Sequence, residues 1–400
     1  MNQRKMIVSL ALSTVILLSS CNSSSSSAAE FDQKDNELYT EGTIAYADDI
    51  DINIPDTDEY YSFTMTHRKT KTSDSLKLFN ELFDKHLKSR YNDSEIDDKK
   101  RFISPDIEQN DKLQYPYCYP RVCDHQQKLL NSDLAVYDLF VDDTKSYLSV
   151  QNGELHAINK GSCYSYLRDK GVIAENNTIG MFLPGDHCET TKQYFHSSED
   201  KVKLMDKVVT VQQAQQKAIE TINELVGGSN IKPYISQTAI VDMKGRQVLS
   251  FSVTGEYKGL PFDANEMKSS GAMRTSEYSN GKYYDNMPAA AYLDSSDNLD
   301  ILVGYSNDYV IEDEKRADMK IGLKQAMKIA DEKFSANTKL VVRRIELVYC
   351  KEKPSDTNDG EISYHCYPVW KLSANPNNSD TDLCIYVNAQ VGECYYYENK

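Results

Sequence analysis

Apolar residues recur along the first half of this chain with two different periods, which separate an expected helix from expected strands. Residues 49–54 alternate between isoleucine and polar side chains, and this two-residue period predicts a half-buried strand that ends before Pro55. Between residues 72 and 91, apolar side chains recur every three or four positions, as in an amphipathic helix. Residues 37–203 are therefore expected to form an N-terminal α+β domain. Its shorter strand-like runs cover residues 135–140, 146–150 and 153–158.

The second half of the chain opens with a helix signal followed by strand signals. Thr210 and Gln213 have the spacing of a capping box, and the helix they begin is expected to stop at Gly227-Gly228. Small or apolar residues follow on one face of this helix at positions 214, 218, 222 and 226. A strand pair is expected at residues 238–243 and 247–255, joined by a turn at Gly245.

The same order of elements recurs about 112 residues further on. Residues 323–334 repeat the small-residue helix, and apolar runs at 340–350, 362–372, 383–387 and 391–397 predict the strands that follow. Each helix would cover one face of an antiparallel sheet. We therefore expect an α+β fold with two helix-on-sheet modules in tandem, covering residues 208–312 and 318–400.

The N-terminal residues have a different composition from the rest. Arg4 and Lys5 precede an apolar run to Leu18, and Leu18-Ser19-Ser20-Cys21 is followed by five serines. This arrangement resembles the lipobox of bacterial lipoproteins, in which a signal peptidase cuts before the cysteine and that cysteine carries acyl chains such as palmitate. The resemblance implies a signal peptide at residues 1–20, lipidation of Cys21 and a flexible Ser-rich tether at 21–36. It also implies an extracytoplasmic location, anchored to a bacterial membrane at the cell surface or in the periplasm.

The charge of the chain narrows its range of partners. The 400 residues include 45 basic and 61 acidic side chains, which gives a net charge of −16. Removing residues 1–20 takes away Arg4 and Lys5 and no acidic residue, so the mature charge is −18. Such a charge argues against nucleic acid and against adhesion of the protein surface to anionic lipid. The lipid on Cys21 is therefore the expected membrane contact.

Eight cysteines remain once Cys21 is set aside, and an even number in an exported chain suggests disulfides. Nearest-neighbour pairing is favoured, and free thiols are the alternative. The expected pairs are Cys118 with Cys123, Cys163 with Cys188, Cys350 with Cys366, and Cys384 with Cys394.

The second expected module resembles the PepSY-like modules of bacterial envelope proteins. The matching segments are Gln325-Ala326-Met327-Lys328-Ile329-Ala330, Pro368-Val369-Trp370-Lys371-Leu372 and the hairpin from Ile385 to Glu393; Gly259-Leu260-Pro261-Phe262 is similar to a turn of that family. The resemblance implies a non-catalytic role in binding or regulating envelope enzymes. It supplies no catalytic residue.

Three patterns of candidate chemistry have simpler structural explanations. Soft ligands cluster at Cys118, Cys123 and His125 and at His187, Cys188 and His196, but exported cysteines more often form disulfides than zinc sites. Asp49-x-Asp51-x-Asn53 begins like a calcium loop but lacks the required glycine, so a strand is favoured. Ser198-x-x-Lys201 with Ser296-Asp297-Asn298 matches two motifs of penicillin-binding enzymes, and no Lys-Thr-Gly follows. No catalytic residue, metal or cofactor is therefore expected.

Tyrosine is abundant, with 28 residues against one tryptophan. Tyr115, Tyr117 and Tyr119 alternate with prolines and cysteine in a dense patch, which is a candidate binding surface. Packing on a sheet is the alternative. Tyr395-Tyr396-Tyr397 is expected to form the final strand.

These patterns favour a non-catalytic lipoprotein that binds or regulates an envelope protein or glycan. Two alternatives stay open, an envelope hydrolase with its site in residues 37–203 and a structural surface protein.

Overall fold

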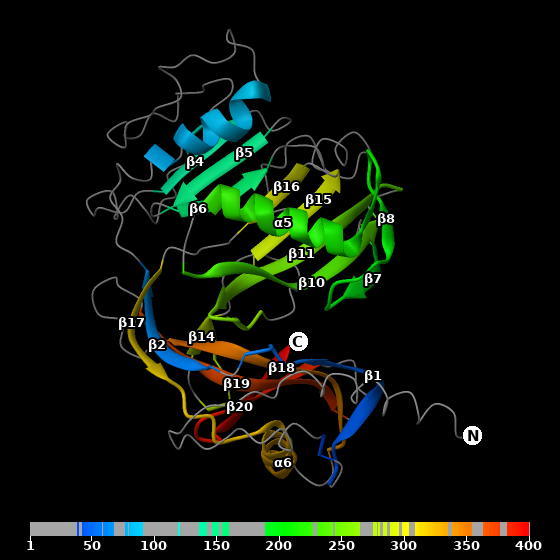
Figure 1. Ribbon diagram of the computed structural model, residues 1–400, viewed down its shortest axis with the longest axis vertical. Coiled ribbons are helices and arrows are strands. Elements are labelled where there is room, and N and C mark those ends of the chain that lie inside the picture. The colour runs from blue at the N-terminus through cyan, green and yellow to red at the C-terminus, as the bar shows by residue number, and fades with distance from the viewer. Residues whose placement is uncertain are drawn as a thin grey trace, which may run out of the picture.

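The computed structural model shows a mixed α+β, sheet-rich protein (Figure 1). It describes residues 38–39, 42–57, 59–67, 77–78, 80–90, 119–120, 136–141, 146–151, 154–159, 189–226, 230–242, 245–264, 275–277, 279–280, 283–285, 289–295, 298–303, 309–334, 338–353, 363–376 and 382–399. Two large sheets lie one above the other in Figure 1, each carrying a long helix on its outer side.

The α5 sheet is named for the helix that covers it. Its described strands follow the order β3-β4-β5-β6-β16-β15-β11-β10-β7, with β12 paired to β11, and every described pairing is antiparallel. The strands are β3 (Tyr119–Pro120), β4 (Val136–Val141), β5 (Ser146–Gln151), β6 (Glu154–Asn159), β7 (Glu189–Tyr194), β10 (Lys232–Asp242), β11 (Gln247–Tyr257), β12 (Leu260–Pro261), β15 (Ala289–Ser295) and β16 (Asn298–Val303).

Helix α5 (Val211–Val226) begins at the expected capping box. The Thr210 N–H donates to Gln213 Oε1 at 3.0 Å, and the Gln213 N–H donates to Thr210 Oγ1 at 3.1 Å. The buried face of the helix carries Ala214, Ala218 and Ile222 and packs on aliphatic residues of the sheet. The helix predicted here is confirmed.

A second helical segment packs against the same core. Residues 77–78 and 80–82 are α-helical, and a π-helical turn η2 (Phe83–Leu87) and a 3₁₀ turn η3 (Lys88–Arg90) follow. Leu82, Phe83 and Leu87 are buried in the core under α5. The three-and-four spacing between residues 72 and 91 therefore did indicate a helix over the described positions.

The α6 sheet is built around a long hairpin of two 14-residue strands, β18 and β19. The outer edge of β18 pairs with β1 in parallel and with β14, whereas the outer edge of β19 pairs with β2 and β20. The strands are β1 (Ala45–Asn53), β2 (Tyr61–His67), β13 (Thr275–Glu277), β14 (Tyr283–Asp285), β17 (Tyr309–Arg316), β18 (Leu340–Lys353), β19 (Ser363–Pro376), β20 (Asp382–Asn388) and β21 (Cys394–Asn399).

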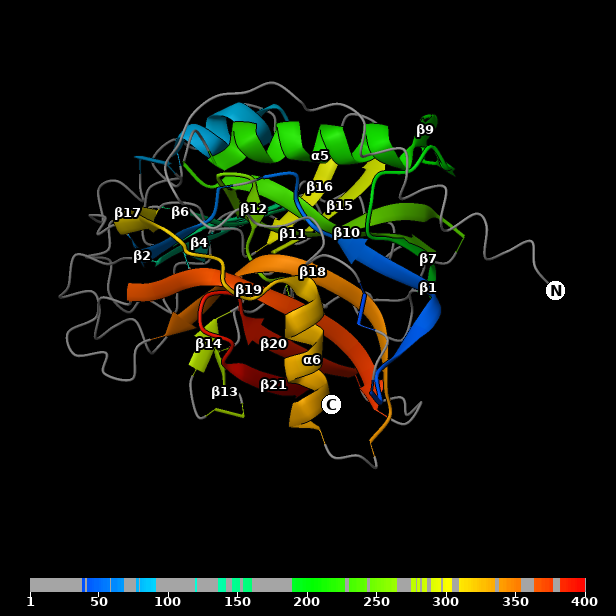
Figure 2. The same cartoon turned by 60° about the horizontal axis from the view of Figure 1, so that its bottom comes forward.

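Helix α6 (Leu323–Lys333) covers β20 and β21 on the outer side of this sheet (Figure 2). Its buried residues include Ala326, Met327 and Ala330. Trp370 is fully buried beneath it, and its indole Nε1–H donates to the Ile321 carbonyl at 2.7 Å. A large aromatic ring can be buried here because its one polar group has a partner.

The strands of residues 37–203 do not form a sheet of their own among the described elements, because they join two sheets that also contain later strands. β1 and β2 pair with β18 and β19 in the α6 sheet, whereas β6 and β7 pair with β16 and β10 in the α5 sheet. Strands at the edge of a sheet expose unpaired backbone groups, and the early strands satisfy those groups on both sheets. Strands β13 and β14, from residues 208–312, and β17, which begins in them, likewise belong to the α6 sheet.

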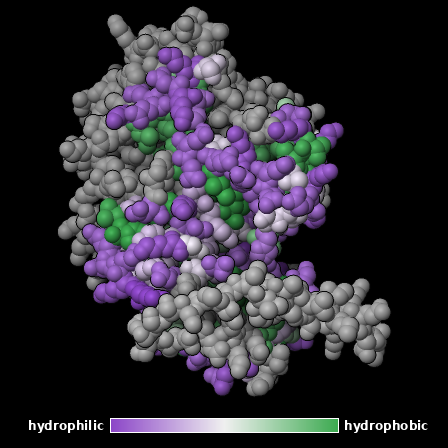
Figure 3. Space-filling model, in the orientation of Figure 1, coloured by the Kyte–Doolittle hydropathy of each residue, from purple (hydrophilic) through white to green (hydrophobic). Residues whose placement is uncertain are grey.

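The surface of the described residues is mainly hydrophilic on the face drawn in Figure 3, with hydrophobic residues in separate patches. Among the described helices, none is long and apolar enough to cross a membrane.

Candidate functional site

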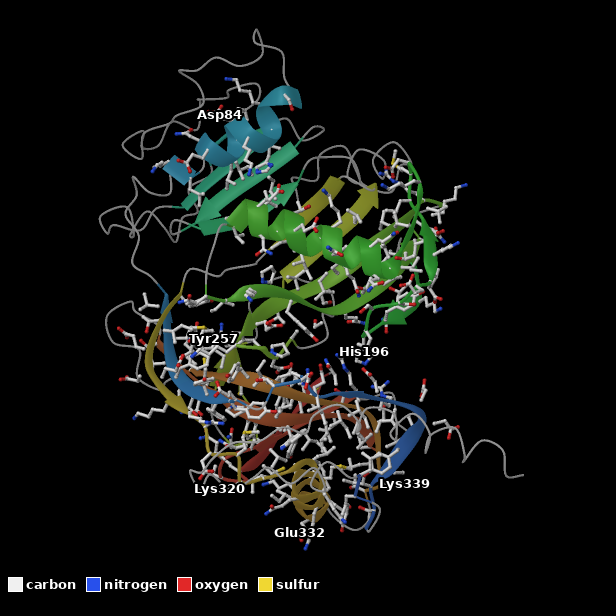
Figure 4. All side chains as sticks on the ribbon, in the orientation of Figure 1. Asp84, His196, Tyr257, Lys320, Glu332 and Lys339 are labelled. Carbon is white, nitrogen blue, oxygen red and sulfur yellow. The ribbon has the colours of Figure 1, made fainter. Side chains whose placement is uncertain are left out.

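Charged side chains gather where the two sheets meet, in a set that we call the inter-sheet cluster. Its members come from β1, the segment before β8 (Lys201–Lys203), the residue after Phe262, and strands β18, β19 and β20. They are Asp51, His196, Asp263, Arg344, Glu346, Lys371 and Tyr386. Figure 4 shows His196 at one end of the zone between the sheets and Tyr257 at the other.

The register of the central hairpin brings the inner charges together. A bulge in β18 between Val342 and Arg344 reverses the alternation, so that Val342 belongs to the core under α6 whereas Arg344 belongs to the opposite face. Glu346, two residues further on, shares that face with Arg344. Glu346 is directly opposite Lys371 on β19. Directly opposite residues in an antiparallel pair lie close enough to interact, so the ladder itself positions one of these ion pairs.

Lys371 is the innermost cation, and its side chain is 3% exposed. Its Nζ lies 2.7 Å from Asp263 Oδ1 and 3.5 Å from Glu346 Oε2. Burial alone would lower the pKa of Lys371, but the nearby carboxylates of Asp263 and Glu346 raise it well above its ordinary value. The ammonium is therefore charged at physiological pH.

Asp263 is held in place from three directions. Its carboxylate accepts bonds from Lys371 Nζ and from the Tyr386 hydroxyl, the latter at 2.8 Å. Its backbone N–H donates to the Tyr349 carbonyl at 2.9 Å, and Phe262 forms an isolated bridge with the same tyrosine. The chain leaving β12 thus fastens to the edge of β18 between β1 and β14.

Arg344 joins three strands. Its Nη2 lies 2.7 Å from Glu346 Oε1, and its Nε lies 3.2 Å from Asp51 Oδ2 on β1. Nη2 also donates to the Ser236 carbonyl of β10 at 3.3 Å, and the guanidinium lies 4.1 Å from the ring centroid of Phe195. A planar guanidinium can bond in several directions and stack at once, which a lysine ammonium cannot do.

His196 forms the solvent end of the cluster, with a side chain that is 54% exposed. Its Nε2 bonds to Asp51 Oδ1. This bond raises the pKa of His196 above its ordinary value, although partial burial opposes the shift. The Asp51 carboxylate therefore links a titratable imidazole on one side to Arg344 on the other.

An aromatic group joins the sheets at the opposite end. Lys258 and Gly259 have φ values of 49° and 83° and form the two-residue turn between β11 and β12. The Phe63 ring centroid lies 4.8 Å from that of Tyr257 and 5.1 Å from that of Tyr349. The rings on either side of this turn, Tyr257 and Phe262, thus take part in a contact between the sheets.

The four late cysteines are free thiols, so the expected pairs 350–366 and 384–394 are not formed. Cys350 is opposite Tyr367 in the ladder and Cys366 is opposite Lys351, which places the two thiols on opposite faces of the sheet. Cys384 and Cys394 also belong to opposite faces of the β20–β21 hairpin. Pairing the nearest cysteines in the sequence did not take into account that successive strand residues face opposite sides of the sheet.

Burial keeps the thiols of Cys350, Cys366 and Cys394 protonated at neutral pH. It raises the pKa of Cys350 and Cys366 well above the ordinary value, and that of Cys394 to about 11. The Tyr395 hydroxyl donates to Cys350 Sγ at 3.1 Å, which opposes only part of the effect of burial on Cys350.

Several other sequence candidates lie outside the described residues. Tyr119 begins the edge strand β3 opposite Phe140. The undescribed candidates are Cys21, Tyr115, Tyr117, Cys118, Cys123, His125, Cys163, His187, Cys188, Ser296 and Asp297.

The calcium-loop-like residues, the Ser198 motif and the C-terminal tyrosines lie in ordinary strands and turns. Asp49, Asp51 and Asn53 lie on β1, and Asp51 bonds to basic side chains. Ser198 Oγ accepts the Asp200 N–H at 3.1 Å as part of a local turn before β8. Residues 395–397 are part of the final strand β21, as expected.

The charges at 263, 344, 346 and 371 were not singled out from the sequence. A signal was present, because each lies within or beside an apolar run that predicts a buried strand. A charge in such a run indicates either a strand edge or a buried ion pair.

The fold and this cluster define a mixed α+β protein whose two sheets are joined by buried, paired charges. Comparison with protein-family models, curated proteins and solved structures found no match to this chain.

Proposed function

We propose that this chain is a bacterial lipoprotein, lipidated at Cys21, that holds a rigid non-catalytic body beside the membrane to bind or regulate an envelope protein or glycan. The sequence support is the leader ending in Leu18-Ser19-Ser20-Cys21 and the serine run that follows it. In this proposal residues 1–20 are removed and residues 21–36 form the tether.

The structural observation that carries the proposal is the fastening of the first described segment to both sheets. The Thr43 N–H donates to Asp331 Oδ1 of α6 at 2.9 Å, and Gly42 has a φ of 104° where a Cβ would collide with that carboxylate. Further along, Asp51 pairs with Arg344 on β18 and with His196 next to the α5 sheet. A body fixed in this way would move as one unit on an N-terminal tether, with both sheets held to the segment that follows the tether.

The order of elements supports a tandem architecture like that of PepSY-like modules. α5 is followed by the antiparallel series β10, β11, β15 and β16, and α6 is followed by the antiparallel series β18, β19, β20 and β21. The role in binding or regulation rests on this resemblance, and Tyr115, Tyr117 and Tyr119 remain the proposed binding patch.

The anchor is tested by changing the cysteine that would carry it. Cells expressing the chain are fed an alkyne-labelled fatty acid, and we expect label on the wild type and none on Cys21→Ala. Cys394→Ala is the matched control, since it removes a cysteine of the body and should keep the label. Unlabelled wild-type protein would overturn the anchor.

The binding role is tested with the mature body carrying Cys21→Ser. We expect the body to sediment with purified cell-wall glycan or to crosslink to one envelope protein, and replacement of Tyr115, Tyr117 and Tyr119 by alanine should weaken this. Phenylalanine at the same positions keeps the rings and should keep most of the binding. Release of soluble fragments from the glycan would instead support the envelope hydrolase.

A further inference from the structure

A small hairpin projects from the α5 sheet beside the start of α5. It consists of β8 (Lys201–Lys203) and β9 (Val208–Thr210), and the Leu204 N–H donates to the Lys207 carbonyl at 3.0 Å across the turn. Its inner face packs on the body, because Val202, Leu204 and Val209 are buried in the core under α5. The hairpin is therefore fixed to the body.

The outer face of this hairpin is apolar and basic at once. Met205 is 65% exposed and Val208 is 56% exposed, and they are two of the five exposed large hydrophobic residues among the described positions. Lys201, Lys203 and Lys207 are exposed beside them, and Lys203 is directly opposite Val208. With Asp206 included, residues 201–208 carry a net charge of +2 in a chain whose net charge is −16.

Exposed apolar side chains beside lysines are more favourable at the interface of a bilayer than in water. A single exposed apolar side chain on a soluble protein needs no explanation. Met205 lies in the turn and Val208 begins β9, with Lys203 and Lys207 next to them. This matches the pattern by which peripheral proteins insert apolar side chains while basic groups contact anionic headgroups. A soluble polyanion would attract the lysines but would not cover Met205 and Val208.

The position of the hairpin fits an N-terminal anchor. Figures 1 and 2 both show β8 and β9 on the same side of the molecule as β1, and His196, shortly before β8, bonds to Asp51 of β1. Residues 22–37 separate Cys21 from the first described residue. A flexible chain of that length has a root-mean-square span of about 20–25 Å, so the body would stay within a few nanometres of the lipid.

We propose that the β8–β9 hairpin is a second membrane contact, which inserts Met205 and Val208 among the headgroups of an anionic bilayer and orients the tethered body. The inference rests on the proposed lipid anchor, because the anchor raises the local concentration at which a weak contact becomes occupied. The net negative charge of the chain does not prevent this contact, because charges more than about 10 Å from the membrane surface are largely screened at physiological salt. The positive charge of the hairpin then contributes more to the interaction with the membrane than the acidic residues elsewhere in the chain.

The test reports the environment of the hairpin tip with an inserted tryptophan. The chain has one native tryptophan, Trp370, which is fully buried and supplies a constant background. The mature chain carries Cys21→Ser and a hexahistidine tag at its N-terminus, and is tethered through that tag to vesicles with nickel-chelating lipid. The vesicles contain phosphatidylcholine alone or with phosphatidylglycerol.

Met205→Trp is the reporter, and Val391→Trp is its matched control. Val391 is 71% exposed in the turn after β20, close to Ala389, whose carbonyl accepts the Lys320 N–H. Figure 4 shows Lys320 on the side of the molecule away from β8 and β9. Both positions are exposed in the folded chain, so neither change should disturb the core.

We expect the Met205→Trp emission to move to shorter wavelength and to be quenched by brominated lipid on anionic vesicles, while Val391→Trp responds to neither. Changing Lys201, Lys203 and Lys207 to glutamine in the reporter chain should lower the equilibrium constant for insertion of the tethered hairpin by about fivefold for each lysine, and the blue shift and quenching should fall accordingly. An unchanged Met205→Trp spectrum, or equal quenching at Val391→Trp, would overturn the hairpin contact. Because the tag replaces the lipid, this result is independent of whether Cys21 is acylated, which the fatty-acid labelling tests separately.

Discussion

The core under α5 and the core under α6 are built from different kinds of residue, although each helix lies on an antiparallel sheet. Among the described residues, the core under α5 is aliphatic apart from Phe83 and Phe251. The core under α6 contains Trp370 and several buried tyrosines, and the opposite face of its sheet holds Lys371. Aliphatic packing depends mainly on area and volume, whereas buried rings and charges also need particular partners. We therefore expect the α6 sheet to be less tolerant of substitution.

The largest effect is expected from Lys371→Met. Removing the ammonium leaves the carboxylates of Asp263 and Glu346 buried without their cation, which costs about 3–5 kcal/mol of unfolding free energy in comparable cases. Urea unfolding measures the loss. Adding Asp263→Asn should restore part of it, because one of the unpaired charges is removed.

Lys192→Met is the control for that comparison. Lys192 pairs with Asp200, but both side chains are about half exposed. We expect a far smaller change, because solvent screens an exposed pair. Equal losses at positions 192 and 371 would contradict the special role of the inter-sheet cluster.

The two helices should respond alike to a larger residue at their small buried positions. Ala218 on α5 and Ala330 on α6 are both fully buried, so leucine at either position should destabilise the fold by about 1–3 kcal/mol through overpacking. Gln216→Leu, on the exposed face of α5, is the control. Thermal unfolding of the three variants gives the comparison, and a neutral Ala330→Leu would show that α6 packs loosely.

Loss of the capping box should affect α5 alone. Thr210→Ala removes the bond that Gln213 N–H makes to the threonine hydroxyl and should cost about 1 kcal/mol. The N-cap residue of α6 is Gly322, which has no side chain to make a cap bond. Thr221→Ala, in the middle of α5, is the control and should change stability by a few tenths, ~0.3 kcal/mol or less. Far-UV circular dichroism during urea unfolding measures both, and equal effects would argue against the cap.

The smallest effect is expected from the pH dependence of the His196–Asp51 pair. The pKa of His196 is raised in the folded state, so the pair stabilises the fold below the ordinary histidine pKa of about 6.5 and loses that contribution as pH rises through the folded value. Because the imidazole is more than half exposed, the gain should stay below about 1 kcal/mol. Unfolding free energies of wild type and His196→Gln should differ more at about pH 5.5 than at about pH 8.5. A difference that grows toward high pH would contradict the pairing.

Local signals in the sequence located most of the described elements. The Thr210–Gln213 pair marked the start of α5, Gly245 marked the β10–β11 turn, and the alternation at 49–54 marked β1. Such signals are readable because capping, turns and side-chain alternation act over a few residues. The partners of these elements were not readable. The β1 sequence alone does not show that it pairs with residues almost 300 positions away on β18.

The partners of the charged residues in the candidate site were also not predictable from the sequence. Lys371 and Asp263 are 108 positions apart in the chain, and only the folded sheets bring them within 2.7 Å. The late cysteines show the converse, since Cys350 and Cys366 are near neighbours on one hairpin but belong to opposite faces. Proximity in sequence therefore neither guaranteed nor excluded proximity of side chains.

Residue patterns alone were enough to locate the helices and most of the described strands, to predict a lipidated Cys21 and to show the acidic charge. The folded arrangement was needed to show that early strands complete both sheets, that charged residues of apolar runs pair with one another, and that Met205 and Val208 remain exposed. The physical reason is that local backbone preferences act between neighbours, whereas the pairing of strand edges and buried charges depends on which distant groups the packed sheets bring together.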